Sequence, residues 1–354
     1  MRETSRSRGR AGYAHRVPEF PVRYRSAETD SSRWYGFAFR DGDIVISTRS
    51  RTGTTWMQMI CALLVFQTPD LPAPLAELSP WLDWLITPRE QVWARLEAQR
   101  HRRIIKTHTP LDGIPIDQRA TYIVIGRHPL DIAVSLYHQA GNLDHGRIRQ
   151  LAGQSEPGQS EPGQSEPGQS ESGQSESGQP GSATAQQPPQ LPLREWLLEW
   201  IESDDDAREQ LDSLPGVMCH LADAWARRRE PNVLLVHYND LSADLEGEMR
   251  RLAGLLAITV PEQAWPVLVQ AATFEHMRAR AARLVPDPAG VIRDQQAFFR
   301  RGTPGSGGEL LTSAELARYH ERAALLASPA LLGWLHSADI GSPAPSQARQ
   351  LLAT

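Results

Sequence analysis

The sequence predicts an α/β protein, with a central parallel β-sheet whose two faces are covered by helices. Short apolar runs rich in β-branched residues recur at 44–48, 103–106, 121–126 and 233–237, and each has the length of a buried strand. Helical patterns separate these runs, and connections of that length join parallel strands. Basic, histidine or tyrosine side chains follow the runs, and ligands of parallel sheets bind beyond the carboxyl ends of the strands.

The run at 44–48 leads into the stretch around which the rest of the chain is organised. A polar turn at 49–53 contains a single glycine, and Thr54 and Thr55 open an apolar helix. In such a strand–turn–helix unit, the turn amides and the helix N-terminus form an anion cradle. Arg51 adds a fixed positive charge, so the stretch predicts a phosphate site. The alternative is a capped turn with no chemical role.

The remaining elements follow in order along the chain. Thr87 and Pro88 provide an N-cap and a first-turn proline for a helix that runs to about residue 99. Thr312 and Glu315 have the spacing of a capping box, which predicts a late helix. Further helices are predicted at about 129–139, 193–201, 217–229 and 245–256.

The expected organisation is one domain over residues 31–340, with a disordered basic arm at 1–30 and a flexible tail at 341–354. Residues 151–190 interrupt this domain with a Gly-Gln-Ser-Glu-Pro repeat. From residue 153 on, the repeat has no aromatic or branched aliphatic side chain, so it has no apolar surface whose burial would offset the entropy of ordering. We therefore expect a disordered loop inserted in a folded domain.

Composition excludes several classes of function. The formal net charge of −5 equals the charge of the five glutamates in the repeat, so the folded part is close to neutral and no nucleic-acid partner is expected. No apolar run approaches the roughly 18 residues of a membrane span, and the N-terminal residues lack the apolar core of a secretory signal. Cys61 and Cys219 are too few for a disulfide framework and lack metal-ligand neighbours. These features favour a cytoplasmic protein without a metal or a membrane partner.

Lysine usage singles out one position. Among the 37 Lys and Arg residues, Lys106 is the only lysine, and it stands at the end of the second predicted strand, two residues before His108. Lysine is a compact point charge, whereas arginine is a planar fork, so the position favours a site that arginine would not fit. A coding bias toward arginine explains the rest and makes Arg51 an expected replacement for lysine.

Three segments resemble segments of the cytosolic sulfotransferases. Residues 49–56 are similar to their 5′-phosphosulfate loop, Tyr-Pro-Lys-Ser-Gly-Thr-Thr-Trp, although the first four residues depart from it and Arg51 stands in the place of the lysine. Residues 106–111 resemble the Lys-Thr-His-Leu-Pro segment whose histidine is the catalytic base. Residues 127–135 look like the segment whose arginine and serine hold the 3′-phosphate of the donor.

Three shorter segments extend the resemblance. Residues 237–241 resemble the family's Tyr-Glu-Asp segment, with Asn239 in place of Glu, and residues 273–274 resemble its adenine-contacting Ser-Phe. Residues 299–302 resemble the Arg-Lys-Gly turn that closes on the 3′-phosphate. The family then continues Gly-Asp-Trp-Lys, whereas this chain has Gly-Ser-Gly-Gly at 305–308 and lacks the Trp and Lys.

The resemblance implies a fold and a function. It implies a P-loop NTPase-like three-layer architecture. It implies transfer of a sulfuryl group from 3′-phosphoadenylyl sulfate (PAPS) to a hydroxyl or amine of a small organic acceptor, without a metal. It also allows a homodimer. It implies that His108 is the general base and that Lys106 and Arg51 stabilise the transferring group. The implied donor-binding residues are Arg51, Thr52, Gly53, Thr54, Thr55, Trp56, Arg127, Ser135, Tyr238, Thr273, Phe274, Arg300, Arg301 and Gly302.

Other interpretations of these residues remain open. Candidates for an acceptor pocket are Trp81, Trp84 and Leu85, but the same three side chains could simply pack in the core. Trp56 could likewise pack in the core rather than contact the donor. His108 could be a loop histidine with one backbone hydrogen bond, and Arg127 a strand-end salt bridge.

Two alternatives concern the whole protein. The first is a small-molecule P-loop kinase, although the basic residue here precedes the glycine, whereas a Walker A lysine follows it. The second is a degenerate nucleotide-binding protein without turnover. Magnesium dependence would distinguish the kinase, and donor binding without transfer would identify the degenerate protein.

Replacing residues 154–187 by a short Gly/Ser linker is expected to leave the melting temperature within a few degrees, because the repeat has no core to join. Thermal unfolding of the two chains, followed by circular dichroism, measures the difference. A drop of more than about 10 °C would show that the repeat packs on the domain.

Overall fold

A computed structural model of the chain describes residues 21–151, 191–285, 287, 290–300, 305 and 307–337. Residues 1–20 of the predicted basic arm at 1–30, residues 152–190 of the predicted insert and the predicted tail at 341–354 lie outside these ranges and remain predictions. Residues 21–30 are described and are not a disordered arm, because Tyr24 is buried and Thr29 forms a β-bridge with Trp84. Arg301 and Gly302 of the predicted donor site also lie outside them.

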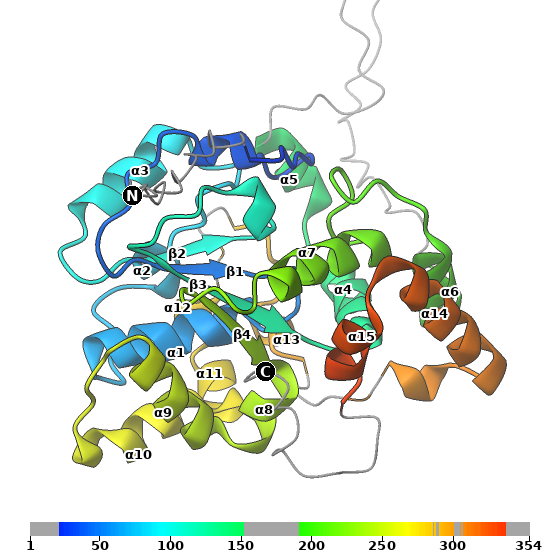
Figure 1. The fold of residues 1–354 in the computed structure, drawn as a ribbon. Coiled ribbons are helices and arrows are strands. Elements are labelled where there is room, and N and C mark those ends of the chain that lie inside the picture. Colours follow the sequence, from blue (N-terminus) through cyan, green and yellow to red (C-terminus); the bar gives the residue numbers. More distant parts are fainter. Residues whose placement is uncertain are drawn as a thin grey trace, which may run out of the picture.

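The described fold is built around a four-stranded parallel sheet with strand order β2–β1–β3–β4 (Figure 1). The predicted third and fourth strands are confirmed residue for residue, whereas β1 ends one residue early and β2 is shifted by one. Nearly every strand residue is buried, as expected for a parallel sheet covered on both faces. The strands are β1 Ile44–Ser47, β2 Ile104–Thr107, β3 Thr121–Gly126 and β4 Val233–His237.

The shift of β2 has a local cause. The side chain of Arg103 forms a two-point ion pair with Asp43. Its Nε donates to Oδ1 at 2.8 Å, and its Nη2 donates to Oδ2. Both side chains are almost fully buried. Because Asp43 directly precedes β1, this ion pair joins the entrances of two neighbouring strands, and losing one partner would leave a buried charge unpaired.

Helices connect the strands and cover the sheet (Figure 1). The longer ones are α1 Thr54–Phe66, α3 Arg89–Ala98, α4 Pro129–Asn142, α6 Leu193–Glu202, α7 Leu214–Ala226, α9 Leu245–Leu255 and α14 Ser313–Leu326. The shorter ones are α2 Leu75–Leu78, α5 His145–Leu151, α8 Tyr238–Ala243, α10 Trp265–Ala271, α11 Phe274–Ala279, α12 Ala281–Leu284, α13 Gln295–Phe298 and α15 Pro329–Leu335. Single 3₁₀ turns occur at Ser31–Trp34, Leu111–Gly113, Glu262–Ala264 and Gly308–Leu310.

The alternation of side chains along β1 divides the core into two layers. Ile44 and Ile46 pack in the layer formed by α1, α2 and α8 to α12. Val45 packs in the layer formed by α3, α4, α6, α7, α14 and α15. Figure 1 shows α1 and α9 on one side of the sheet and α4 and α7 on the other. The predicted parallel sheet with helices on both faces is therefore confirmed.

Most helix boundaries differ from the prediction by a few residues, for identifiable reasons. Helix α7 begins at Leu214 rather than 217, because the Ser213 hydroxyl accepts the N–H of Gly216 at 3.2 Å and a proline occupies the first turn. Helix α3 begins one residue after Pro88. The capping box of α14 is confirmed. The short helices α10 to α13 were not predicted.

All four strands end at the same edge of the sheet. Ser47 pairs with Thr107, and Gly126 pairs with His237, so the last residues of neighbouring strands lie side by side. The segments that follow the strands therefore start from one place. This arrangement brings residues 19 to 190 positions apart in the sequence to a common edge.

Candidate active site

The turn after β1 forms the floor of the site. Arg51 and Gly53 have left-handed backbone conformations, with φ values of 66° and 111°. Thr52 closes the turn by donating from its hydroxyl to the carbonyl oxygen of Arg49 at 2.8 Å. Gly53 then precedes the 13-residue α1, and no side chain caps this helix. The first amides of α1 are thus available to an anion, as a phosphate cradle requires.

Only glycine fits at position 53. A Cβ at this position would lie 3.2 Å from the ring of Tyr238, and the left-handed φ would strain any larger residue. The side chain of Thr54 reaches back to Thr48, with 2.7 Å between the two hydroxyl oxygens. The turn is therefore fixed at both ends by the residues that flank it.

The side chain of Arg51 extends across the site to α4 and α13. Its Nε donates to the Ser135 hydroxyl at 3.0 Å, its Nη1 to Oε1 of Gln139 at 3.3 Å, and its Nη2 to the carbonyl oxygen of Phe298 at 2.9 Å. Burial, and next the charge of Arg127, lower the pKa of Arg51 to about 10. Arg51 and Ser135, which the resemblance assigns to different phosphates, are therefore in direct contact here.

Lys106, the last residue but one of β2, is a buried cation beside an aromatic ring. Its Nζ lies 3.8 Å from the ring centre of Trp81, a cation–π contact. Burial lowers the pKa of Lys106 to about 7; the charge of Asp83 opposes this effect and that of Arg51 adds to it. In the unliganded protein Lys106 is therefore close to half protonated at neutral pH.

His108 is buried two residues further along the same segment. Its Nδ1 is hydrogen-bonded to the carbonyl oxygen of Thr48. A carbonyl can only accept, so Nδ1 carries the proton and Nε2 has the free lone pair. Burial, followed by the charges of Lys106 and Arg49, lowers the pKa of His108 well below its usual value. The imidazole is thus neutral and in the tautomer that a general base needs.

Two buried groups that sequence reasoning missed hold this segment. Oδ2 of Asp83 accepts hydrogen bonds from the hydroxyls of Thr107 and Thr109. The Ser47 hydroxyl donates to the carbonyl oxygen of Thr109 at 2.7 Å, and Nε2 of the buried His220 lies 3.2 Å from the Ser47 carbonyl oxygen. The only sequence signal for Asp83 was a carboxylate between two tryptophans, and His220 had none.

Arg127 follows β3 and contacts the turn. Its Nη1 donates to the carbonyl oxygen of Arg51 at 2.7 Å, and its guanidinium lies 4.4 Å from the ring centre of Tyr238. Trp56 packs edge-on against Tyr238, with 5.3 Å between ring centres, and donates from Nε1 to the carbonyl oxygen of Ala272 at 2.8 Å. Trp56 is thus tied to the core while one side of it faces the cavity described below.

The remaining predicted donor residues divide into two groups. Phe274 and Arg300 reach the cavity. Thr273 instead caps α11, accepting the N–H of His276 at 3.3 Å, and it does not line the cavity.

Asp131 holds the turn that carries the unusual Gly-Ser-Gly-Gly sequence, because its carboxylate accepts the amides of Gly305 and Gly307 at 2.8 and 3.0 Å.

The turn approaches α4 closely at the position where the family has tryptophan. A Cβ on Gly307 would lie 2.5 Å from the backbone carbonyl carbon of Leu130, which is too close for any residue but glycine. The turn therefore rests directly on the first turn of α4 and is anchored by Asp131 rather than by a bulky side chain.

These residues surround one cavity of about 410 Å³. Its charged lining falls into cations, which are Arg51, Lys106, Arg127 and Arg300, and carboxylates, which are Glu28 and Asp212. The apolar lining includes Leu136, Ala140, Leu143, Ile148, Trp196, Val291 and Ile292. The cations suit an anionic donor and the apolar side suits an acceptor, with His108 lining the same cavity.

Two of the three predicted acceptor residues line the cavity. Trp81 and Trp84 are stacked, with ring centres 5.0 Å apart and planes inclined by 7°. Trp81 also meets the His108 ring edge-on at 4.6 Å. Leu85 is 37% exposed and does not line the cavity, so the structure does not bring it to the site.

The described residues offer neither a metal site nor a membrane span. Among them, no cluster of three or more His, Cys, Asp or Glu side chains is arranged to hold a metal ion. None of the helices in the described ranges is both long and apolar enough to cross a membrane.

Fold and site together define an α/β transferase with an anion cradle and an adjacent neutral histidine. The sulfotransferase domain family matches residues 41–324, which is most of the chain. The protein therefore belongs to the sulfotransferase family, and it is an enzyme that transfers a sulfuryl group. This membership does not favour the kinase or the protein without turnover.

Individual relatives agree with the family. A glycolipid sulfotransferase of Mycobacterium bovis is 40% identical over 329 residues, covering 90% of this chain and 95% of the relative. Human sulfotransferase 2B1 is 25% identical over 306 residues, covering 84% of this chain and 69% of the relative. The structure of retinol dehydratase in complex with androsterone and the inactive cofactor PAP has a TM-score of 0.58 at 18% identity, covering 90% and 87% of the two chains. This last likeness supports the predicted fold.

Lys106→Met is expected to stabilise the unliganded protein by roughly 2–4 kcal/mol at pH 6, because the native lysine must then be buried with its charge. Between about pH 7 and 10.5 only the unfolded chain holds this proton, so the wild-type stability rises with pH and the advantage of the variant shrinks. Urea unfolding of both proteins at pH 6 and pH 9 measures the difference in their free energies of unfolding at each pH. Equal differences at the two pH values would contradict a lowered lysine pKa.

Proposed function

We propose that the sulfuryl donor is PAPS and that it binds with its phosphates against the turn after β1. The observation that carries this proposal is the convergence of an uncapped helix N-terminus, four cationic side chains and a neutral histidine in one cavity. PAPS carries phosphate groups at the 5′ and 3′ positions of its ribose. The segments at the carboxyl ends of β1, β2 and β3 each contribute a cation to the cavity that can pair with them. The PAP complex of the structural neighbour retinol dehydratase agrees with this choice of donor.

The reaction assigns a distinct role to each group. His108 accepts the proton of the acceptor hydroxyl at Nε2 while the new oxygen–sulfur bond forms. The bond between sulfur and the bridging phosphate oxygen breaks, and the electron pair stays on the departing bisphosphate. Lys106 and Arg51 stabilise the negative charge that develops there, and no metal is required for this. Protonation of Lys106 accompanies donor binding, because nearby phosphates favour the charged form.

The acceptor that we propose is a hydroxyl compound with a polar head and an apolar tail. The stacked pair Trp81 and Trp84 lies beside His108, which suits a sugar or another ring that carries the reacting hydroxyl. The apolar side of the cavity, from α4, α5 and α6 to residues 291–292, suits a tail. The 40% identical relatives are glycolipid sulfotransferases, and an acceptor of that kind would use both parts.

We further propose a cytoplasmic enzyme that acts without nucleic acid, in keeping with the resemblance of its motifs to those of the cytosolic sulfotransferases. Cys61 is buried and neither described cysteine is disulfide-bonded. A homodimer remains part of the proposal, although its contact would differ from one built on the missing Trp and Lys at 305–308.

His108→Ala is expected to lower the turnover number by roughly 10²–10⁴-fold, because His108 is the only histidine among the described residues that line the cavity. Affinity for adenosine 3′,5′-bisphosphate, measured by calorimetry, should change less than about threefold. Steady-state transfer from labelled PAPS gives the rate. Near-normal turnover in the variant would remove His108 from this role, and loss of nucleotide binding would mean that the substitution damaged the cradle.

Alkyl glycosides are expected to become better acceptors as their tails lengthen from two to eight carbons, with KM falling by up to about threefold per CH₂. The free sugar and the free alkyl alcohol should both be poorer than the octyl glycoside. Ile148→Ala, which truncates the buried apolar lining, should raise KM for the octyl acceptor and leave KM for the ethyl acceptor unchanged. A KM that is independent of tail length would contradict the proposed apolar subsite while leaving PAPS as the donor.

A further inference from the structure

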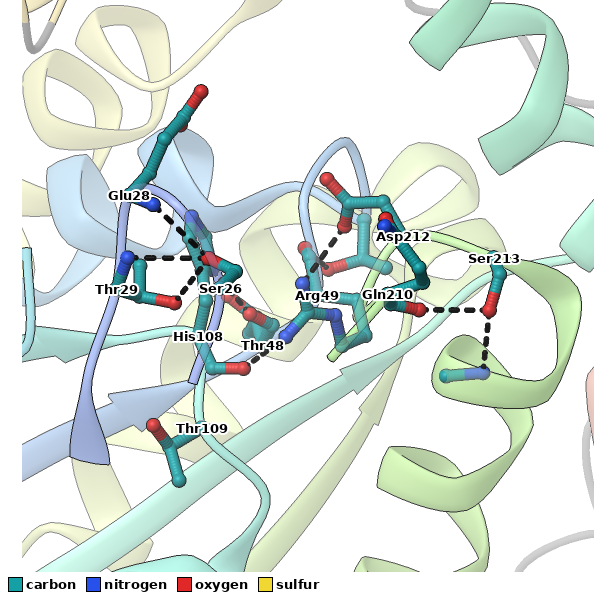
Figure 2. Close-up of polar contacts among 12 residues, drawn as sticks. Ser26, Glu28, Thr29, Thr48, Arg49, His108, Thr109, Gln210, Asp212 and Ser213 are labelled. Carbon is teal, nitrogen blue, oxygen red and sulfur yellow. Dashed lines mark hydrogen bonds and ion pairs between the residues drawn. The ribbon is translucent and has the colours of Figure 1, made fainter. Parts of the chain in front are cut away.

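Arg49 is a buried cation that the mechanism above does not use. It stands where the sulfotransferase loop usually has tyrosine, directly before the cradle. Its side chain is only 3% exposed. Nη1 donates to the carbonyl oxygen of His108, and Nη2 donates to Oδ1 of Asp212 at 2.8 Å. Figure 2 shows the guanidinium lying between the backbone of His108 on one side and the carboxylate of Asp212 on the other.

His108 is thereby held at two points by consecutive residues of one loop. The carbonyl oxygen of Thr48 takes the proton on Nδ1 and fixes the rotation of the ring. The guanidinium of Arg49, the next residue, fixes the position of the main chain that carries the ring. A hydrogen bond that involves a charged group is shorter and stronger than a neutral one, so the second restraint is the stronger of the two.

Asp212 is itself held in place, although its carboxylate is 44% exposed. Its carbonyl oxygen accepts Nε1–H of Trp200 at 2.8 Å. The next residue, Ser213, caps α7 and donates to the carbonyl oxygen of Gln210 at 2.7 Å. The loop between α6 and α7 therefore presents a fixed carboxylate to Arg49, and a buried guanidinium needs such a partner.

The charge of Arg49 also acts on His108. The charged and titratable groups that affect the imidazole are Lys106, Arg49 and His220, and each of them disfavours the protonated ring. Burial lowers the pKa of His220 to about 3, so His220 stays neutral, and without a bound donor Lys106 loses its proton near pH 7. The charge of the Arg49 guanidinium is present whether or not a donor is bound.

We propose that Arg49, held by Asp212, is a positioning residue for the general base His108. It fixes the backbone of His108 relative to the donor cradle and keeps the imidazole ready to accept a proton. This proposal rests on the role of His108 in the proposed function. A purely structural arginine would affect only stability. A positioning arginine changes the turnover number and its pH dependence, and leaves donor binding intact.

The test compares Arg49→Gln, Arg49→Lys, Asp212→Asn and the double variant Arg49→Gln with Asp212→Asn. The glutamine is shorter and uncharged and cannot bridge the His108 carbonyl and Asp212, whereas the lysine keeps the charge but also cannot bridge both partners. Arg40→Gln is the matched control, because Arg40 also donates to backbone carbonyls, those of Gln99 and Glu97, at the far entrance of the sheet. For each protein we would measure kcat as a function of pH, affinity for adenosine 3′,5′-bisphosphate, and the melting temperature.

Arg49→Gln should lower kcat by roughly tenfold to a hundredfold through misplacement of the base. It should also shift the acid limb of kcat to higher pH by roughly 0.5–1 unit, because a repulsive charge has left the imidazole. Arg49→Lys should lose rate without this shift. Asp212→Asn should lose about threefold to tenfold alone and nothing further in the Arg49→Gln background, since the clamp acts only through Arg49. Arg40→Gln should change neither rate nor pH profile.

The outcomes separate this proposal from the one on which it rests. If His108→Ala is inactive while Arg49→Gln folds with wild-type kcat and an unmoved acid limb, Arg49 is structural and this proposal is wrong. If His108→Ala keeps its turnover, both proposals are wrong. Should Arg49→Gln fail to fold, Asp212→Asn and Arg49→Lys decide: wild-type kcat in both would reject a positioning role.

Discussion

Positive charge held out of water at one edge of the sheet is the constraint on which the site depends. Burial lowers the pKa of Arg51 to about 10 and that of Lys106 to about 7, so in the unliganded protein both cations are held at a cost. Where carboxylates are missing, aromatic faces compensate in part. The ring centres of Phe298, Trp81 and Tyr238 lie 4.6, 3.8 and 4.4 Å from the charges of Arg51, Lys106 and Arg127, respectively. An anionic donor, as proposed above, would offset part of this cost.

The sequence predicted the parts of the fold that depend on local pattern. The bounds of β3 and β4 were predicted to the residue. A buried parallel strand appears in the sequence as a continuous run rich in β-branched residues that ends where polar residues begin. Lys106, His108 and Arg127 were found because each stands at or directly after the end of a strand, and parallel register carries strand ends to one edge. The helices α10 to α13 were missed, since elements of four to seven residues are too short for a period of 3.6 to show.

Other parts of the site could not have been predicted from one sequence. Arg49 meets Asp212 across 163 positions, and His220 meets Ser47 across 173, so no local pattern relates the partners. Leu85 was assigned to the pocket because it is apolar and adjacent to Trp84, yet its side chain is exposed and does not line the cavity. Adjacent residues outside regular secondary structure do not share a face, and pattern reasoning has no rule for such turns.

The solitary lysine has a consequence for the chemistry that can be done on the protein itself. Apart from the terminal amine, Lys106 is the only primary amine in the chain, and its pKa of about 7 leaves much of it as the free base at neutral pH. Unprotonated amines react with acylating and aldehyde reagents, whereas ordinary surface lysines are almost fully protonated under the same conditions. A reagent small enough to enter the cavity would therefore label this enzyme at one internal position, beside the histidine, and a bound donor would shield that position.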